Sequence, residues 1–243
     1  MTPTTVNLPA LREGDYLSAA GETHRGMIKK LNQDRVLMRG PEVPVVEERG
    51  GGYLFGVIDG MGSRKGGEIS ADITQTTLFE YYRKPDGAGP ERIEALLHEA
   101  NRRVCERQAA DMELFNMACV VSLAWTTEDR IELFHVGDTR IYGINGTGLV
   151  QLTEDHNDRI GKITDYIGNP RGLGIDRHTL DPDDWDLLLI CSDGLPLEVP
   201  DARIVEIVQE YEEAPDRVVQ GLLQAALIAG GRDNVTVVVV GLG

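Results

Sequence analysis

The chain has 243 residues, of which 41% are hydrophobic and 26% are charged, and its formal net charge is −16. This length fits one large domain with a substantial core, and the composition excludes a disordered, collagen-like or coiled-coil protein. Nucleic acid and anionic membrane surfaces are excluded as partners, because the summed field of so acidic a protein repels both.

The chain has three cysteines, Cys105, Cys119 and Cys191, with no Cys-x-x-Cys spacing among them. Two of them lie in apolar runs, which is typical of small core residues rather than of zinc ligands or disulfides. The sequence also lacks a signal-peptide pattern and any run of about 18 apolar residues. We therefore expect a reduced, cytoplasmic protein that does not span a membrane.

The first part of the chain is predicted to be an N-terminal arm at residues 1–16, either loose or a short edge strand, followed by a single domain at residues 17–243. Residues 41–52 contain two prolines and three glycines and are expected to form a loop. The continuous apolar run at 53–58 predicts a buried strand that ends at Asp59-Gly60.

Helices are expected next, at residues 68–82 and from Pro90 onward, where apolar residues recur every three or four positions. The middle of the chain is rich in β-branched and apolar residues, and Asn145-Gly146 is typical of a hairpin turn. These patterns predict strands at 118–125, 131–136 and 140–144.

Residues 156–184 are polar and predicted to be irregular. A second buried strand is expected at 186–191, ending at Ser192-Asp193-Gly194, followed by two helices and a last buried strand. The helices are predicted near 201–211 and 215–229, and the strand at 235–240. Hairpin-type links between strands favour antiparallel sheets, so the order of elements predicts an α+β domain with two helical layers.

Four aspartates repeat one local pattern, and three of the four lie at the mouth of an apolar strand: Asp34, in Asn32-Gln33-Asp34, and Asp59, Asp193 and Asp233. A buried aspartate is unfavourable unless it binds a metal or caps a turn, and glycine beside it lets a carbonyl such as that of Gly60 approach a ligand. All-oxygen ligands favour Mg²⁺ or Mn²⁺ over zinc. A single Asp-Gly can equally be a structural turn, so only the combination of motifs can distinguish a metal site from ordinary turns.

That combination resembles the successive motifs of the PPM (type 2C) family of metal-dependent serine/threonine protein phosphatases, and Met61 resembles the bacterial branch. Each motif alone is weak, but together they occur in the family's order from residue 23 to residue 234. The segments are Thr23-x-x-Gly26-x-x-Lys29-x-x-Asn32-Gln33-Asp34, Val57-Ile58-Asp59-Gly60-Met61-Gly62, His135-Val136-Gly137-Asp138-Thr139-Arg140, Ser192-Asp193-Gly194 and Gly231-x-Asp233-Asn234.

The resemblance implies a central antiparallel β-sandwich flanked by α-helices on both faces, in four α-β-β-α layers. It also implies two divalent ions, Mn²⁺ or Mg²⁺, which share a water that attacks the phosphorus of phosphoserine or phosphothreonine in a protein. The partners would be a phosphorylated protein and an opposing bacterial Ser/Thr kinase, and the enzyme would be a monomer. The implied ligands are Asp34, Asp59, the Gly60 carbonyl, Asp193 and Asp233, with Asp138 and Asp193 at a weaker third site.

Three features depart from the family pattern or leave a role open. Lys29 stands where the family usually has an arginine for the substrate phosphate; lysine keeps the charge but loses the bidentate fork, and it could also be a surface residue. The flap, at about 156–168, is shorter than in most relatives, which should leave the cleft more open. His156 matches a recurrent family position, with a structural or a catalytic role.

Three other functions remain open at this stage. The chain could be an inactive phosphatase-fold binding module, or a phosphatase acting on antagonists of anti-sigma factors. It could also be a small-molecule or nucleotide phosphohydrolase, although no Walker-type glycine loop is present.

Overall fold

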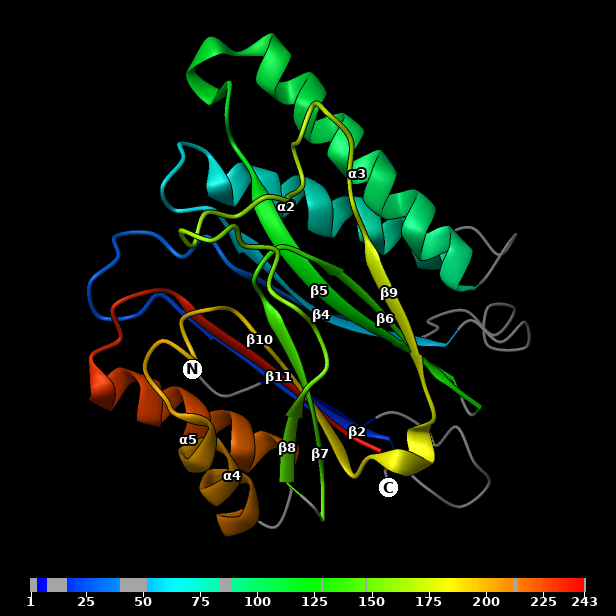
Figure 1. Cartoon of the computed structure of the whole chain (residues 1–243), viewed down its shortest axis with the longest axis vertical. Coiled ribbons are helices and arrows are strands. Elements are labelled where there is room, and N and C mark those ends of the chain that lie inside the picture. Colours follow the sequence, from blue (N-terminus) through cyan, green and yellow to red (C-terminus); the bar gives the residue numbers. More distant parts are fainter. Residues whose placement is uncertain are drawn as a thin grey trace.

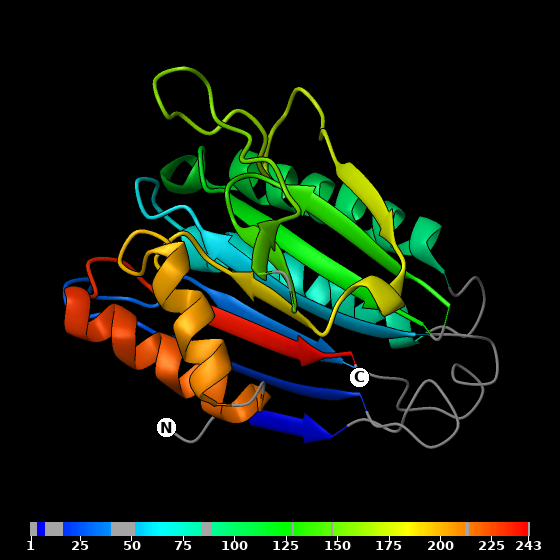
Figure 2. The ribbon, with the colours of Figure 1, turned by 60° about the horizontal axis from the view of Figure 1, so that its bottom comes forward.

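The computed structural model describes residues 4–7, 17–39, 52–83, 89–127, 129–146, 148–211 and 214–242. Within these residues two antiparallel β-sheets pack face to face, and a pair of helices covers the outer face of each sheet (Figure 1). The four layers are seen edge-on in Figure 2. This is the four-layer α+β sandwich that the sequence predicts.

The first sheet has six strands in the order β1-β2-β11-β10-β7-β8, and every neighbouring pair is antiparallel. Its two central strands come from the last quarter of the chain, and β2 from the beginning pairs directly with the last strand. The strands are β1 Thr4–Asn7, β2 Ser18–His24, β7 Arg140–Asn145, β8 Gly148–Gln151, β10 Leu187–Cys191 and β11 Val235–Gly241.

The second sheet has five antiparallel strands in the order β3-β4-β5-β6-β9. Strands β4, β5 and β6 form its centre; β5 and β6 are joined by a short turn, whereas α2 and α3 lie between β4 and β5 in the sequence. The strands are β3 Arg35–Arg39, β4 Tyr53–Gly60, β5 Cys119–Thr126, β6 Ile131–Val136 and β9 Asp176–Leu180.

Among the described residues, four helices form the outer layers: α2 Gly67–Leu78 and α3 Pro90–Ala110 against the second sheet, and α4 Asp201–Glu210 and α5 Pro215–Ala229 against the first. Helices α3 and α5 each begin with a proline, whose fixed φ suits the first helical turn. Three short 3₁₀ segments lie at Phe79–Arg83, Met112–Leu114 and Pro182–Asp184. None of the helices in the described ranges has the length and apolar composition that crossing a bilayer requires.

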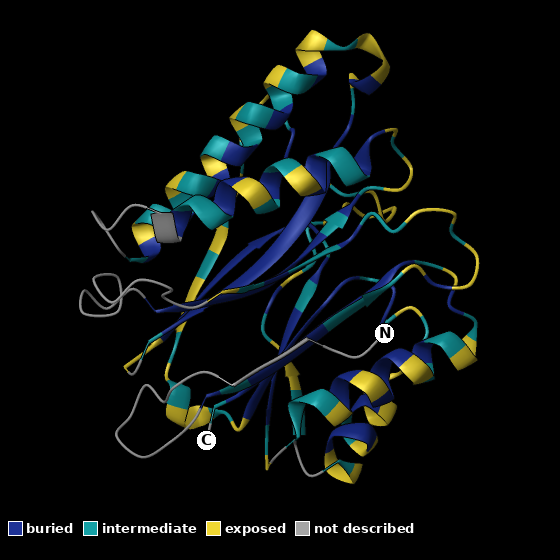
Figure 3. Ribbon diagram, turned by 180° about the vertical axis from the view of Figure 1, so that it is seen from behind, coloured by how far each residue is buried: buried dark blue, intermediate teal, exposed yellow. Residues whose placement is uncertain are grey.

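The apolar strands are buried on both faces, which explains why their sequences read as continuous hydrophobic runs. In β4, Leu54 and Ile58 pack under the helices of the outer layer, whereas Phe55 and Val57 point into the layer between the two sheets. The runs at 118–125, 186–191 and 235–240 correspond to β5, β10 and β11, so those predictions are confirmed. Figure 3 shows that the strands are largely buried, whereas the outer faces of the helices are exposed.

The sequence prediction was wrong in the interval 156–184, which was expected to be irregular but contains β9. This strand lies at the edge of its sheet and most of its side chains are exposed, so it lacks the apolar alternation that marks a strand. The helix predicted at 68–82 is α2 followed by the tighter 3₁₀ turn at Phe79–Arg83. Residues 4–7 of the expected arm form β1, while residues 8–16 and most of the loop expected at 41–52 lie outside the described residues.

Phe55→Ala is expected to lower the free energy of unfolding by about 3–5 kcal/mol, because Phe55 is fully buried between the sheets and the substitution leaves a cavity there. Urea denaturation followed by circular dichroism measures the change. Val150→Ala, at an exposed position of the edge strand β8, is the control and should change stability by less than about 0.5 kcal/mol. Equal effects of the two substitutions would contradict the assignment of the inter-sheet core.

Candidate metal centre

The aspartates singled out in the sequence lie at one end of the sandwich, because the strands that carry them all finish or begin there. Asp59 is the penultimate residue of β4, Asp138 lies in the turn between β6 and β7, and Asp193 follows β10. Asp233 precedes β11, and Asp34 precedes β3. The antiparallel arrangement thus gathers residues that are up to about 200 positions apart in the chain.

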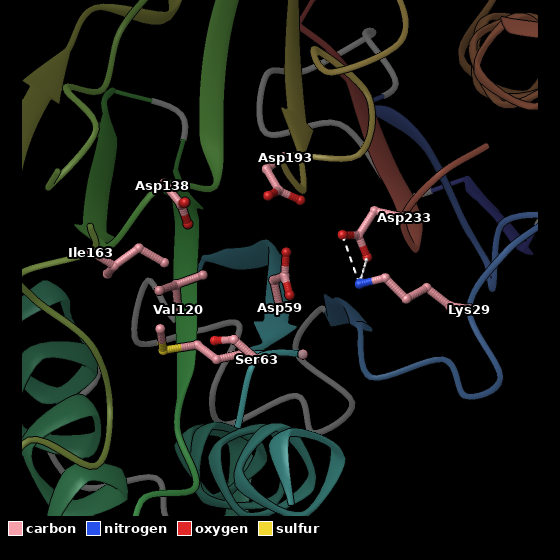
Figure 4. A pocket seen from close by; sticks show the side chains of 10 residues that line it. Lys29, Asp59, Ser63, Val120, Asp138, Ile163, Asp193 and Asp233 are labelled. Atoms are coloured by element: carbon pink, nitrogen blue, oxygen red, sulfur yellow. Dashed lines mark hydrogen bonds and ion pairs between the residues drawn. The ribbon is translucent and has the colours of Figure 1, made fainter. Parts of the chain in front are cut away.

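Four of these aspartates and Lys29 surround a pocket of about 270 Å³ (Figure 4). The side chains of Asp59, Asp138 and Asp193 converge on the same space from three different segments. The remaining lining residues are Met61, Gly62, Ser63, Val120 and Ile163. The pocket is of a size to hold a phosphate group with small ions rather than a large organic cofactor.

Asp34 does not line the pocket but is buried beside it, with 1% of its surface exposed. One carboxylate oxygen, Oδ2, accepts a 2.6 Å hydrogen bond from Thr236 Oγ1 on β11. The other, Oδ1, has no hydrogen-bond partner in the part of the chain that the structure describes. A buried carboxylate oxygen without a partner is unfavourable, so Asp34 is suited to a cation that supplies the missing interaction.

The pKa values of the gathered carboxyl groups are raised. Burial raises the pKa of Asp34 to about 6, and burial followed by repulsion from Asp193 raises the pKa of Asp138 to about 7. Burial raises the pKa of Asp59 well above its usual range, with further repulsion from Asp34 and Asp193. The pKa of Asp193 is raised by burial and by Asp233. Carboxyl groups held close together in this way are typical of cation sites and of acid–base sites.

Lys29 is an immediate positive neighbour of these carboxylates. Its Nζ lies 2.6 Å from Oδ1 and 2.8 Å from Oδ2 of Asp233, and the side chain points into the pocket (Figure 4). Lys29 is therefore part of the pocket wall and not a solvated surface lysine. No three His, Cys, Asp or Glu side chains among the described residues are already close enough to form a preassembled metal site.

Position 60 requires a glycine, because two backbone segments approach each other too closely there to leave room for a side chain. Its N–H donates to the carbonyl of Gln33 at 3.2 Å, and a Cβ at this position would lie 2.5 Å from the backbone of Gly67. Asp59 and Asp34 are brought together by this contact, since each lies next to one of the bonded residues. Gly67 is also the first residue of α2, so the helix start is fixed against the same turn.

Asn234 holds the segment between β2 and β3 with three hydrogen bonds. Its Oδ1 accepts from the N–H of Gln33 at 2.8 Å, and its Nδ2 donates to the carbonyls of Arg25 and Leu31 at 2.8 and 2.9 Å. The side chain is 5% exposed and uses both ends of its amide. Asn234 thereby positions the loop that carries Lys29 and leads to Asp34.

The turn that carries Asp138 is hydrogen-bonded to the segment that follows β8. His156 donates its N–H to the carbonyl of Gly137 at 2.7 Å, and its Nδ1 accepts from the N–H of Gly137 at 3.2 Å. Arg140 makes a bidentate ion pair with Asp155, with distances of 2.7–3.2 Å. His156 does not line the pocket, so its contacts favour the structural alternative, in which it positions the turn.

Some residues of the site were not found by sequence reasoning. Thr236 stands as a single hydroxyl in the apolar run of β11, and that interruption was the available signal for a buried polar partner. Ile163, which lines the pocket from the flap, carries no such signal because its sequence neighbourhood is polar and irregular.

Comparison with known proteins agrees with the fold and the motifs. The profile of the protein phosphatase 2C family matches residues 21–227. The chain therefore belongs to the protein phosphatase 2C family.

Among curated proteins, the chain is 27% identical to the serine/threonine phosphatase stp of Listeria monocytogenes, over 92% of this chain and 95% of that protein. It is 28% identical to the serine/threonine protein phosphatase PstP of Mycobacterium tuberculosis, over 92% of this chain but 44% of PstP. Among solved structures, Stp1 from Staphylococcus aureus superposes with a TM-score of 0.82 at 23% identity, covering 94% of this chain and 96% of that one.

Asp138→Asn should change how the stability of the metal-free protein depends on pH. Because the pKa of Asp138 is raised to about 7, the folded state keeps a proton that the unfolded state releases above its pKa of 3.8. The wild-type free energy of unfolding therefore falls as pH rises from about 4 to 7, and the neutral asparagine removes this contribution. In EDTA, the stability of the variant relative to wild type should increase by on the order of 4 kcal/mol between pH 4 and pH 8.

Urea denaturation at both pH values measures this change. Asp186→Asn is the control, since Asp186 is an exposed residue at the opposite end of β10. A constant difference between Asp138→Asn and wild type across the pH range would contradict the raised pKa.

Proposed function

We propose that the chain is a metal-dependent phosphatase that removes phosphate from phosphoserine and phosphothreonine in proteins. The observation that carries the proposal is the gathering of Asp59, Asp138, Asp193 and Asp233 around one small pocket, beside a buried and unpartnered oxygen of Asp34. Membership of the protein phosphatase 2C family and the names of the relatives support the choice of a phosphorylated protein as substrate.

The residues present fit divalent ions. The donors are all oxygen atoms, which is the ligand chemistry of Mg²⁺ and Mn²⁺, and the orphaned oxygen of Asp34 gives such an ion a partner that the protein lacks. We assign Asp34, Asp59, Asp193, Asp233 and the Gly60 carbonyl to two ions, and Asp138 with Asp193 to a weaker third.

When bound, two divalent ions lower the pKa of a shared water and neutralise charge on the phosphoryl oxygens. The protein residues then have separate tasks. The carboxyl group of Asp59 is repelled by both Asp34 and Asp193, so Asp59 would be suited to contact both ions. Lys29 supplies a positive charge that can turn from Asp233 to the substrate phosphate.

Direct hydrolysis agrees with the state of the cysteines. No cysteine is among the residues that line the pocket. Burial raises the pKa of the Cys119 thiol to about 11, and burial also raises the pKa of Cys191. Both side chains are fully buried. Neither is therefore suited to act as the thiolate nucleophile of a covalent phosphoenzyme.

Asp193→Asn should abolish most of the activity on p-nitrophenyl phosphate and on a phosphothreonine peptide, with a loss in kcat of about 100-fold or more in Mn²⁺ or Mg²⁺. Isothermal titration should show weaker binding of Mn²⁺ to the variant, and EDTA should stop the wild-type reaction. Asp186→Asn, at the other end of the same strand β10, is the matched control and should be fully active. Folded wild-type protein without turnover in any metal would instead support an inactive binding module.

Lys29→Ala should raise the KM for p-nitrophenyl phosphate by about 5- to 20-fold, because the substitution removes the cation beside the phosphate. Lys29→Arg should restore most of the loss, since arginine keeps the charge and adds a second donor. The neighbouring exposed Lys30 is the control position, and Lys30→Ala should leave this KM unchanged. A KM for Lys29→Ala equal to that of wild type would remove Lys29 from substrate binding.

A further inference from the structure

The loop between β2 and β3 displays three large apolar side chains to solvent. Met27 is 63% exposed, Ile28 is 69% exposed and Leu31 is 60% exposed. They flank Lys29, whose side chain points into the candidate metal centre. Much of the loop is drawn as exposed in Figure 3, and Lys29 lines the pocket. An apolar surface therefore borders the place where a substrate phosphate would lie.

The loop holds these side chains outward on a fixed backbone. Met27 donates its N–H to the carbonyl of Gly231 at 2.7 Å, and Asn234 bonds to the carbonyls of Arg25 and Leu31. Gly26 has φ 75°, and a Cβ there would lie 2.1 Å from the carbonyl oxygen of Asp233. Since the loop backbone is packed this tightly, the exposure of its apolar side chains is a property of the folded surface. Clustered apolar exposure of this kind marks interaction sites.

The charge of the loop is opposite to that of the rest of the protein. Between His24 and Gln33 the sequence contains Arg25, Lys29 and Lys30 and no acidic residue, in a chain of net charge −16. An acidic or phosphorylated segment is repelled by most of this surface and attracted here. Lys29 is paired with Asp233, so the exposed Arg25 and Lys30 supply the positive charge that lies beside the apolar side chains.

We propose that the loop Arg25–Leu31 is a docking surface for the phosphorylated segment of a protein substrate, in which an apolar residue lies close to the phosphoresidue and acidic residues lie nearby. The proposal rests on the phosphatase function proposed above and names the substrate class of that site. Because Ile28 adjoins Lys29, an extended peptide with its phosphate in the pocket would bring a residue about one to three positions away to the apolar side chains, at about 3.3 Å per residue.

A substrate segment fits this surface better than the other possible occupants. Three side chains offer much less area than the roughly 1,200 Å² that a stable dimer buries, and a net charge of −16 opposes contact with anionic lipid. Lys29 makes the loop continuous with the pocket, so a ligand whose phosphate lies in the pocket can also reach the loop.

The test compares peptide and small-molecule substrates in Ile28→Ser and Leu31→Ser. Two acidic phosphothreonine peptides are used, one with leucine two residues from the phosphothreonine and one with serine there. Wild type should favour the leucine peptide, and each variant should lose about 5- to 20-fold in kcat/KM for it, through KM. Both variants should hydrolyse p-nitrophenyl phosphate as well as wild type does. Val150→Ser, on the exposed edge strand β8, is the control and should behave as wild type.

The docking surface is refuted if the variants lose no more activity on the leucine peptide than Val150→Ser does, or if wild type treats the two peptides alike. Failure of the phosphatase proposal looks different, because wild type would then hydrolyse neither peptide nor p-nitrophenyl phosphate. In that case, fluorescence anisotropy of the labelled leucine peptide measures whether the loop binds the peptide. Equal affinity of the peptide for wild type and Ile28→Ser would refute the docking surface. If wild type but not Ile28→Ser sediments with anionic vesicles, the surface binds a membrane instead of a peptide. If wild type forms a dimer that Ile28→Ser does not form, the surface binds a second copy of the chain.

Discussion

Repulsion among buried aspartates at one end of the sandwich is the constraint on which the rest of the structure depends. Burial and neighbouring charge raise the pKa values of Asp34, Asp59, Asp138 and Asp193 together. A fold that places these groups side by side gives up stability in the absence of a cation. The two sheets and four helices supply an apolar core large enough to tolerate that loss. The gathered carboxyl groups thus lower the stability of the protein at this end of the sandwich.

The segments carrying these aspartates are held by contacts between distant parts of the chain. Asn234 fixes the loop that leads to Asp34 through three hydrogen bonds. The N–H of Gly60, at the end of β4, donates to the carbonyl of Gln33, just before β3. On the other side, His156 holds the turn that carries Asp138. These supports lie on strand ends or on loops packed against them, so the carboxylates are presented by a rigid frame.

Much of this frame was predictable from the sequence, for physical reasons. Strands β4, β10 and β11 are buried on both faces, so each is a continuous apolar run whose end is visible in the sequence. Asp59, Asp193 and Asp233 were found because they lie at the ends of those runs, whereas Asp34 was found through the motif Asn32-Gln33-Asp34. Strands β2 and β9 were not predicted, since β2 consists largely of small and polar residues and β9 is an exposed edge.

Other features of the site are invisible without coordinates because they depend on packing between distant elements. The motif containing Asp34 does not reveal that this carboxylate lies deepest or that Thr236, some 200 positions later, is its partner. The ion pair between Lys29 and Asp233 depends in the same way on the approach of two loops. The sequence predicted Lys29 as a phosphate ligand, a role that is still a proposal, but not its contact with a carboxylate of the same pocket.

The pairing of β2 with β11 has a consequence for biosynthesis. Ser18–His24 pairs with Val235–Gly241, so the first sheet cannot be completed while the ribosome is still adding the intervening residues. Asp233, Asn234 and Thr236 arrive with that same last strand. A nascent chain therefore has neither a complete sheet nor a complete set of carboxylates, and long-range pairing of this kind slows folding. The end of the sandwich that carries the carboxylates would therefore form in one late step, after β11 has become available to pair with β2.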